Sequence, residues 1–236
     1  MNSTDNSTTH KPKIKRYNNF FYDFVKVTGA LPMLLWLRPK YIHVSGKKPP
    51  KYRKGILVAC NHVSFADPVM LLMAFWYRRL HCVANKELCS DKFMSFFFKN
   101  VGCILIDKEH FSIGSMKEAC NLLKNDKAVV IFPEGTVDRT DELLSFKGGA
   151  VMMAYLGRQQ ILPVYLVPPK SKWERRVMIY GDPVDICSMM GDHATKEKVA
   201  ELSLYLHEKE EELKAFYENK VKSKKRKGSN PVNEEK

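Results

Sequence analysis

The sequence predicts an α/β fold: one domain with a largely parallel or mixed sheet, preceded by a helical segment and followed by a C-terminal helix. Short apolar segments recur between residues 41 and 181, and helix-like segments lie between several of them. Strands that alternate with helices are typical of this class. The 236 residues, 44% of them hydrophobic, are sufficient for one such domain.

The composition divides the chain into five parts. Residues 1–16 are polar and then basic, so we expect a disordered tail. Residues 17–40 form an aromatic-rich and leucine-rich segment, and the domain itself covers residues 41–190. An amphipathic helix is predicted over residues 195–219, followed by a basic disordered tail over residues 220–236.

The segment before the domain has the composition of a membrane-associating helix. Asp23 and Lys26 interrupt it, so its apolar stretch is shorter than the roughly 20 residues of a transmembrane helix. Gly29 and Pro32 break it, which allows either a helix or a hairpin. We expect it to lie in one leaflet with Trp36 at headgroup level; a soluble helix packed on the core is the alternative.

Seven short apolar segments are predicted strands. They cover residues 41–46, 55–60, 80–84, 103–107, 128–132, 161–167 and 176–181. The sixth contains Pro163, and because proline lacks the N–H donor of a ladder, this position predicts an edge, a bulge or a close approach.

Helices are predicted between the strands and after them. Within the domain they cover residues 68–79, 112–125 and 146–158. The C-terminal helix repeats apolar residues at roughly helical spacing: Val199, Leu202, Leu206, Leu213 and Phe216.

The net charge of +13 predicts an anionic partner. Residues 1–60 hold twelve Lys and Arg against two acids, a local excess of ten. Nucleic acid, anionic lipid and a phosphorylated substrate all fit, and so does a role in solubility alone. The basic run over residues 220–227 allows a nucleic-acid patch, but no RNP-like, zinc-finger or homeodomain pattern is present, so nucleic acid is not expected.

The six cysteines form no CxxC pair and have no histidine at zinc-finger spacing. Cys60, Cys103 and Cys120 lie in apolar segments, as reduced core cysteines do. We therefore expect a reducing compartment and no metal.

The stretch NHVSFAD, residues 61–67, places a histidine where a buried strand ends. Open α/β sheets bind ligands at such strand ends. Asp67 can fold back onto the ring of His62 and leave the second ring nitrogen as a proton acceptor. Asp67 also precedes Pro68 and could instead cap the following helix, so the pair is either a catalytic base with its orienting acid or a structural contact.

Three further stretches carry polar residues or glycine at strand ends or a proline inside a strand. GCILIDK covers residues 102–108, and FPEGTVDR covers residues 132–139. A glycine after a strand can present backbone N–H groups to a phosphate, and Thr136 can add a hydroxyl. The third stretch is ILPVYLV, which contains Pro163.

In order, NHVSFAD, GCILIDK, FPEGT followed by FKGGA, and ILPVYL resemble the four blocks of the glycerolphosphate acyltransferase family. The resemblance covers residues 41–185 and is strongest to its 1-acyl-sn-glycerol-3-phosphate (lysophosphatidic acid) acyltransferases. It implies an enzyme that moves a fatty acyl chain from acyl-CoA or acyl carrier protein to the free hydroxyl of lysophosphatidic acid, giving phosphatidic acid. Another lysolipid acceptor, a transacylase, or a non-catalytic protein that binds anionic lipid are the alternatives.

The resemblance also implies roles for individual residues. His62 would be the general base, oriented by Asp67, with Asn61 and Ser64 in support; no GxSxG elbow marks Ser64 as a nucleophile. The second and third blocks would bind the acceptor phosphate through Gly102, Asp107, Lys108, Phe132, Pro133, Glu134, Gly135 and Thr136. Pro163 would serve the acyl-donor side or the fold.

Two positions depart from the family pattern. Lys108 stands where arginine is usual, and lysine keeps the charge without the bidentate fork. Val137 stands where arginine commonly follows FPEGT, and Arg139, two residues later, is expected to compensate for it at the acceptor phosphate. These departures affect the expected identity of the acceptor more than the expected type of reaction.

The expected partners follow from this chemistry. They are lysophosphatidic acid, acyl-CoA or acyl carrier protein as co-substrate, and an anionic membrane surface, with no further cofactor. The expected location is peripheral or monotopic on the cytoplasmic face of a bacterial cell membrane.

Overall fold

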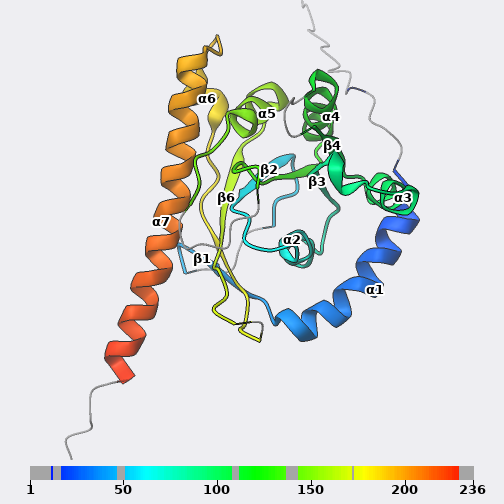
Figure 1. Cartoon of the computed structure of the whole chain (residues 1–236). Helices are drawn as coiled ribbons and strands as arrows, with labels where there is room; N and C mark the ends of the chain where they lie inside the picture. Colours follow the sequence, from blue (N-terminus) through cyan, green and yellow to red (C-terminus); the bar gives the residue numbers. More distant parts are fainter. Residues whose placement is uncertain are drawn as a thin grey trace, which may run out of the picture.

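In the computed structural model, a seven-stranded sheet forms the centre of the molecule, in the strand order β1-β7-β6-β2-β5-β3-β4 (Figure 1). The structure describes residues 12, 17–46, 51–107, 112–136, 143–171 and 173–228. The strands are β1 (Lys40–His43), β2 (Ile56–Cys60), β3 (Leu80–Asn85), β4 (Ile104–Ile106), β5 (Ala128–Ile131), β6 (Ile161–Leu166) and β7 (Val177–Tyr180). All seven coincide with predicted strands.

The sheet is mixed, as predicted. Strands β6, β2, β5, β3 and β4 are parallel, whereas β7 pairs antiparallel with β6 and parallel with β1. Strands β2 and β5 lie side by side in register, with Ala59 opposite Ile131. The segments that leave these two strands therefore emerge together at one edge of the sheet, where ligands of open α/β sheets bind.

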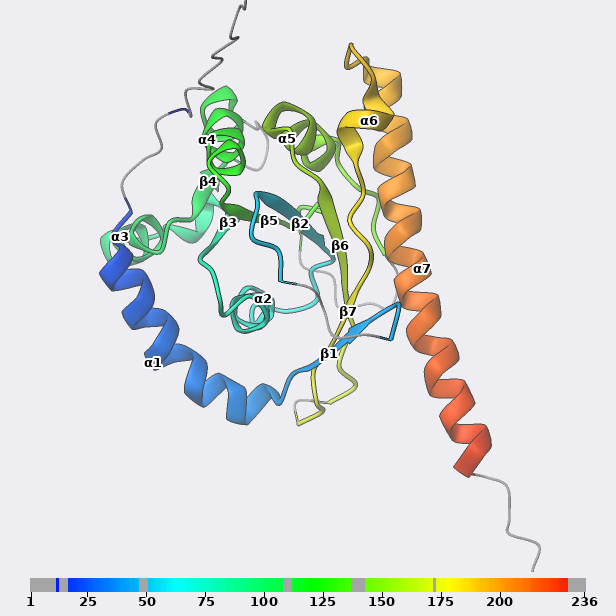
Figure 2. The same cartoon turned by 180° about the vertical axis from the view of Figure 1, so that it is seen from behind.

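Helices pack on both faces of the sheet (Figures 1 and 2). They are α1 (Asn19–Leu37), α2 (Asp67–Ala74), α3 (Lys92–Asn100), α4 (Ile113–Lys124), α5 (Gly149–Gly157), α6 (Ile186–Met190) and α7 (Lys196–Gly228), with a short 3₁₀ helix η1 (Lys86–Leu88). Alternate residues of β2 divide between the two cores. Leu57 and Ala59 join the cluster under α4, α5 and α7, and Val58 joins the cluster with α2. Burial on both faces explains why β2 is apolar throughout.

Several helix boundaries differ from the prediction. Helix α2 ends at Ala74 rather than at residue 79, and the buried Phe75 begins a turn. Helices α3 and α6 were not predicted, although Asp91 caps α3 by accepting a hydrogen bond from Met94 N. Helix α7 continues to Gly228 through residues predicted to be disordered. Of the predicted N-terminal tail, only Pro12 lies among the described residues.

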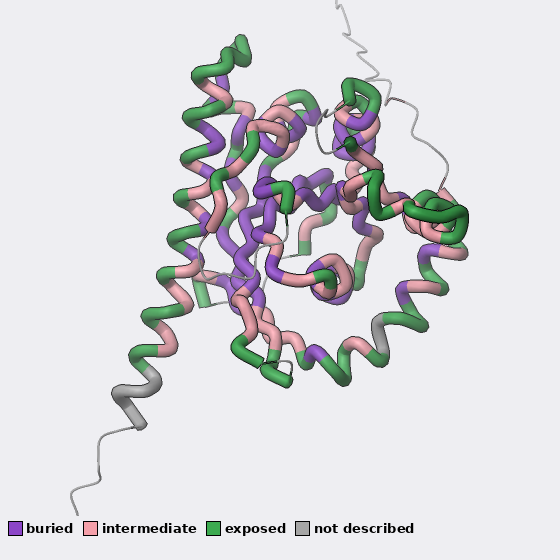
Figure 3. The backbone as a smooth tube through the Cα atoms, viewed as in Figure 1, coloured by how far each residue is buried: buried purple, intermediate pink, exposed green. Residues whose placement is uncertain are grey.

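The N-terminal segment is one helix, not a hairpin. Helix α1 continues through Pro32, and Figure 1 shows it as a curved arm along the outside of the domain. Its length and composition are sufficient to cross a membrane, a criterion that core helices and signal sequences also meet. Figure 3 shows that α1 and α3 are largely exposed, in contrast to the purple sheet.

Pro163 lies inside the sheet rather than at an edge, because β6 is flanked by β2 and β7. Val164 pairs with Tyr180 and Ile161 bridges to Val184, so three residues (181–183) face two (162–163). This is a β-bulge, one of the three predicted explanations, and it accommodates the missing N–H. Gly181 N still donates to the Pro163 carbonyl.

Candidate active site

The predicted His62–Asp67 pair is formed at the end of β2. Nδ1 of His62 lies 2.8 Å from Oδ2 of Asp67. The imidazole is 16% exposed and the carboxylate only 1% exposed. A ring that reaches solvent, held by a buried acid, has the arrangement of a general base and its orienting group.

Asp67 is held entirely by the turn that precedes it. Its Oδ2 also accepts hydrogen bonds from Val63 N (2.8 Å) and Ser64 N (2.7 Å), and its Oδ1 accepts one from Ser64 Oγ (2.9 Å). Helix α2 receives no side-chain cap from its N-cap residue Ala66. The structure therefore does not show Asp67 as a helix cap, because its side-chain hydrogen bonds among the described residues all join it to residues 62–64.

These contacts set the tautomer of His62. Both oxygens of Asp67 act as acceptors, so the proton of the shared hydrogen bond belongs to His62 Nδ1. In the neutral imidazole, Nε2 then carries the free lone pair. The ring also stacks on Phe132, with centroids 4.1 Å apart and planes inclined by 20°. The hydrogen bond and the stacked ring together fix the direction of Nε2.

Asn61 attaches the motif to the sheet. Its Nδ2 donates to the Leu166 carbonyl (3.0 Å) and its Oδ1 accepts from Leu166 N (2.6 Å). The side chain is buried and continues the pairing of β2 with β6 beyond the last strand residues. Asn61 therefore positions the turn rather than facing a ligand.

The FPEGT stretch forms a tight turn beside His62. Gly135 N donates to the Phe132 carbonyl (3.0 Å), and Gly135 has φ +73°, a conformation that favours glycine. The Gly135 amide is thus already used within the turn, although it was one of the predicted phosphate donors. Pro133 accepts a hydrogen bond from Lys147 N (3.0 Å), which ties the start of α5 to the turn.

The other predicted residues are distributed differently. Gly102 precedes β4 at the amino end of the sheet, away from His62, where its carbonyl accepts from the buried ring of His81 (2.9 Å). Its φ of +70° serves a turn. Asp107 directly follows β4 at the same edge as the motif. Lys108 and Arg139 lie outside the described residues.

Sequence reasoning missed one residue behind the motif. Glu210 of α7 is fully buried, and neither carboxylate oxygen forms a well-aligned hydrogen bond among the described residues, although the Asn61 backbone N–H lies near them. Burial raises its pKa well above the ordinary value, and the nearby Glu134 raises it further. A signal was available, because Glu210 lies four residues after Leu206 and three before Leu213 on the apolar stripe.

The cysteines add no reactive thiol to this site. Cys60, directly before the motif, is fully buried, and burial raises the pKa of its thiol well above the ordinary value. A protonated, enclosed thiol is a poor nucleophile. Within the described ranges, all six cysteines are free and no group of three His, Cys, Asp or Glu residues is placed to hold a metal ion.

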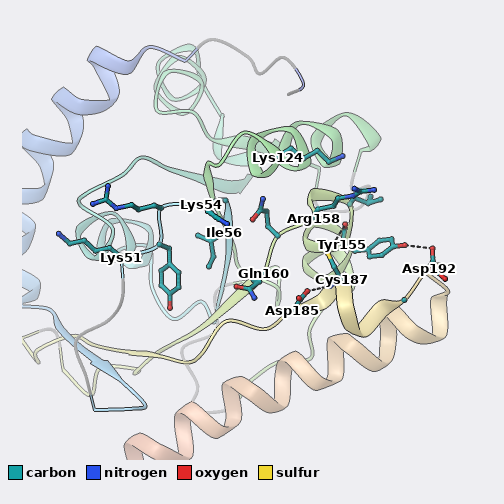
Figure 4. A pocket seen from close by; sticks show the side chains of 16 residues that line it. Lys51, Lys54, Ile56, Lys124, Tyr155, Arg158, Gln160, Asp185, Cys187 and Asp192 are labelled. Atoms are coloured by element: carbon teal, nitrogen blue, oxygen red, sulfur yellow. Dashed lines mark hydrogen bonds between the residues drawn. The ribbon is translucent and has the colours of Figure 1, made fainter. Parts of the chain in front are cut away.

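A separate hollow of about 1070 Å³ lies at the opposite end of the sheet (Figure 4). Its wall includes Ile56, the first residue of β2, and five cations: Lys51, Arg53, Lys54, Lys124 and Arg158. None of the predicted site residues lines it. Lys51 and Lys54 lie on one side of the opening, and Lys124 and Arg158 lie on the other. Lys51, Arg53 and Lys54 belong to the basic first 60 residues of the chain.

Comparisons with known proteins identify the family of this chain. Residues 41–167 match the family described as Acyltransferase. The chain is 30% identical to the 1-acyl-sn-glycerol-3-phosphate acyltransferase of Bacillus subtilis, over 82% of this chain and 96% of that protein. It is 28% identical to the protein of the same name from Streptococcus pneumoniae, over 87% of this chain and 82% of that one.

A solved structure shares the fold. The 1-acyl-sn-glycerophosphate acyltransferase of Thermotoga maritima superposes with a TM-score of 0.58 at 20% identity, over 84% of this chain and 79% of that one. At this identity the likeness concerns the fold alone. The family match covers more than half of the chain and includes the NHVSFAD and FPEGT stretches, so the family expected from the sequence is confirmed. The chain belongs to the acyltransferase family of enzymes.

Proposed function

We propose that this protein transfers a fatty acyl chain from a thioester donor to the free hydroxyl of lysophosphatidic acid, giving phosphatidic acid. The observation that carries the proposal is the His62–Asp67 pair, whose geometry leaves Nε2 of a partly exposed imidazole free to accept a proton. The names of the Bacillus and Streptococcus relatives, both 1-acyl-sn-glycerol-3-phosphate acyltransferases, support this acceptor.

The reaction needs a base because a neutral alcohol is a weak nucleophile. Nε2 of His62 takes the hydroxyl proton as the oxygen attacks the thioester carbonyl. Asp67 holds the imidazole and stabilises its cationic form. The tetrahedral intermediate then collapses, the C–S bond breaks, and the thiolate leaves and takes up the proton from His62. The ester is formed directly.

Direct transfer is favoured because the nearby nucleophiles are engaged or enclosed. Ser64 Oγ donates to Asp67 and accepts from Ala66 N (3.2 Å), so its hydroxyl belongs to the turn. Cys60 is buried within β2. A covalent acyl-enzyme on either residue would require the motif to unfold locally.

The surroundings of the site fit a substrate delivered from a membrane. Phe65, between His62 and Asp67 in sequence, is 71% exposed, which leaves an apolar ring on the surface within the motif. Exposed apolar side chains also cover one face of α1 and part of α3, and we call this set the exposed apolar face. It comprises Phe20, Phe24, Val27, Leu34, Leu35, Phe93 and Phe96. Such a patch on the outside of a domain marks a contact with lipid or protein.

Helix α1 is attached to the domain by its opposite side. Lys26 Nζ donates to the carbonyls of Trp76 (2.6 Å) and Arg78 (3.0 Å), and Asp23 pairs with Arg79 (2.6 Å). This lateral attachment supports a helix that lies in one leaflet. The location that we propose is the cytoplasmic face of the cell membrane, as expected from the sequence. Replacing Phe20 and Phe24 by serine should weaken sedimentation with anionic vesicles, and unchanged sedimentation would contradict the membrane contact.

The test of function is an assay of free thiol release. Purified protein is incubated with lysophosphatidic acid and an acyl-CoA series, and then with acyl carrier protein as donor. We expect release that depends on the acceptor and falls about a hundredfold to ten-thousandfold in His62→Ala. His193→Ala is the matched control, because His193 is exposed and far along the chain from the motif.

The outcomes of the assay distinguish a failure of the base, a different acceptor and a non-catalytic role. Equal rates for wild type and His62→Ala would refute the base. Turnover with another lysolipid but not with lysophosphatidic acid would change the acceptor and keep the chemistry. Vesicle binding without turnover for any donor would favour a non-catalytic lipid-binding protein.

A further inference from the structure

The side chain of Lys147 lies across the FPEGT turn. A Cβ atom built on Gly135 would stand 3.0 Å from Nζ and 3.3 Å from Cε of Lys147. The backbone of Lys147 is fixed at the same place, because its N–H donates to the Pro133 carbonyl (3.0 Å). Glycine at position 135 permits φ +73°, and the end of the Lys147 side chain lies directly over it.

The charge of Lys147 is available for a ligand. The residue is exposed, and within the part of the chain that the structure describes no carboxylate forms an ion pair with it. Glu134, the acid of the turn, is itself buried, with 6% of its surface exposed. Val137, directly after the turn in sequence, has no charge.

Lys147 and His62 meet the same turn at different points. The ring of His62 stacks on Phe132, and the Phe132 carbonyl accepts from Gly135 N, the residue over which Lys147 lies. The turn thus connects a proton acceptor with a cation that forms no ion pair among the described residues. In a lysolipid phosphate, the free hydroxyl and the phosphate are only a few covalent bonds apart, which suits this arrangement.

We infer that Lys147 binds the phosphate of the acceptor and thereby selects a lysolipid with a phosphomonoester headgroup. This inference rests on the proposed function and adds a residue to it. A dianionic phosphate gains a charge-assisted contact with the ammonium group, whereas an uncharged glyceride gains none. The role belongs to acceptor binding, and the acyl donor is not involved.

The experiment compares wild type with Lys147→Gln, Lys147→Arg and Lys54→Gln. Lys54 is an exposed lysine at the opposite end of β2, on the wall of the hollow in Figure 4, and serves as the matched control. KM is measured separately for a short-chain lysophosphatidic acid and for the acyl-CoA donor. Calorimetry measures binding of the same lysophosphatidic acid without donor.

We expect Lys147→Gln to raise KM for the acceptor, and to weaken its binding, by about tenfold or more. KM for the donor should be unchanged, Lys147→Arg should recover most of the loss, and Lys54→Gln should behave as wild type. A rise in both KM values would indicate a general structural defect and would overturn the inference. Unchanged acceptor KM in Lys147→Gln would overturn it as well.

The calorimetry separates this inference from the proposed function. If wild type releases no thiol with any donor, the proposed function fails, but acceptor binding that is lost in Lys147→Gln still supports the phosphate contact. Equal binding by wild type and Lys147→Gln, or no binding by either, overturns it. Thermal unfolding of each variant verifies that the fold is retained.

Discussion

Two buried carboxyl groups lie behind His62, one in the motif turn and one on α7, and their surroundings differ. Asp67 is 1% exposed and accepts four hydrogen bonds, from the His62 ring, two backbone amides and the Ser64 hydroxyl. Glu210 is 0% exposed, and its oxygens form no well-aligned hydrogen bond among the described residues, although the Asn61 backbone N–H lies near them. Both are shielded from water, but only Asp67 has well-aligned donors in its place.

The difference shows what a buried acid needs in order to work as an anion. Donors replace the water that Asp67 loses, so its negative charge can orient His62 and stabilise the imidazolium. For Glu210, burial raises the pKa well above the ordinary value, the negative charge of Glu134 raises it further, and only the Asn61 backbone opposes the rise. The raised pKa favours the uncharged form of Glu210, so burial opposes a second negative charge behind the base.

The largest expected effect is on Asp67. In Asp67→Asn, the amide places a donor where Val63 N and Ser64 N now donate, and it no longer holds the His62 tautomer. We expect kcat/KM for thiol release to fall about a hundredfold to ten-thousandfold. Asp182→Asn is the control, because Asp182 is 80% exposed and outside the motif. Activity within a few fold of wild type would show that the turn alone orients the ring.

The second prediction concerns Glu210. Its contribution to the free energy of unfolding should fall as the pH rises, whereas that of most paired acids increases. Its pKa is raised in the folded state, so the free energy of unfolding is highest below the ordinary Glu pKa of about 4.3 and falls as the pH rises towards the raised value. Glu210→Gln removes this titration. We expect a gain of about 1 to 3 kcal/mol at pH 8 and little change at pH 4.

Denaturant unfolding at several pH values measures this gain. Glu211→Gln is the matched control, because it makes the same change on the neighbouring, exposed residue of α7. The same pH dependence in wild type and Glu210→Gln would contradict the prediction. Such a result would mean that Glu210 has donors in solution and resembles Asp67 more than the structure shows.

The smallest expected effect comes from removing one donor to Asp67. Ser64→Ala deletes the 2.9 Å hydrogen bond to Oδ1 and leaves the three donors to Oδ2 in place. We expect a loss of about 0.5 to 1.5 kcal/mol in the free energy of unfolding. The same assay should show a decrease in kcat/KM of no more than about tenfold. A loss as large as that of Asp67→Asn would instead identify Ser64 as a reacting group.

Much of the fold was predictable because its signals are local. All seven strands coincide with short apolar segments, and β2 is apolar on both faces because both are covered. Helix α2 was predicted too long, because its pattern did not show that Phe75 turns into the core. Helix α3 was missed because none of its residues is fully buried, and its aromatic side chains Phe96 and Phe97 contact Phe21 of α1 rather than the sheet.

Part of the site was likewise predictable from local sequence, and part was decided by the tertiary structure. The sequence by itself determined that the chain has a histidine and an aspartate five residues apart at a strand end, since spacing and strand pattern are local properties. The tertiary structure decided that Asp67 bonds back to the turn instead of capping α2, that Gly102 lies at the other end of the sheet, and that Lys147 lies over Gly135. It also brought Glu210 from α7 to the back of the motif. Most of these contacts join residues that lie far apart in the sequence. Local sequence preferences do not predict them, because strand order and helix packing determine which distant residues come into contact.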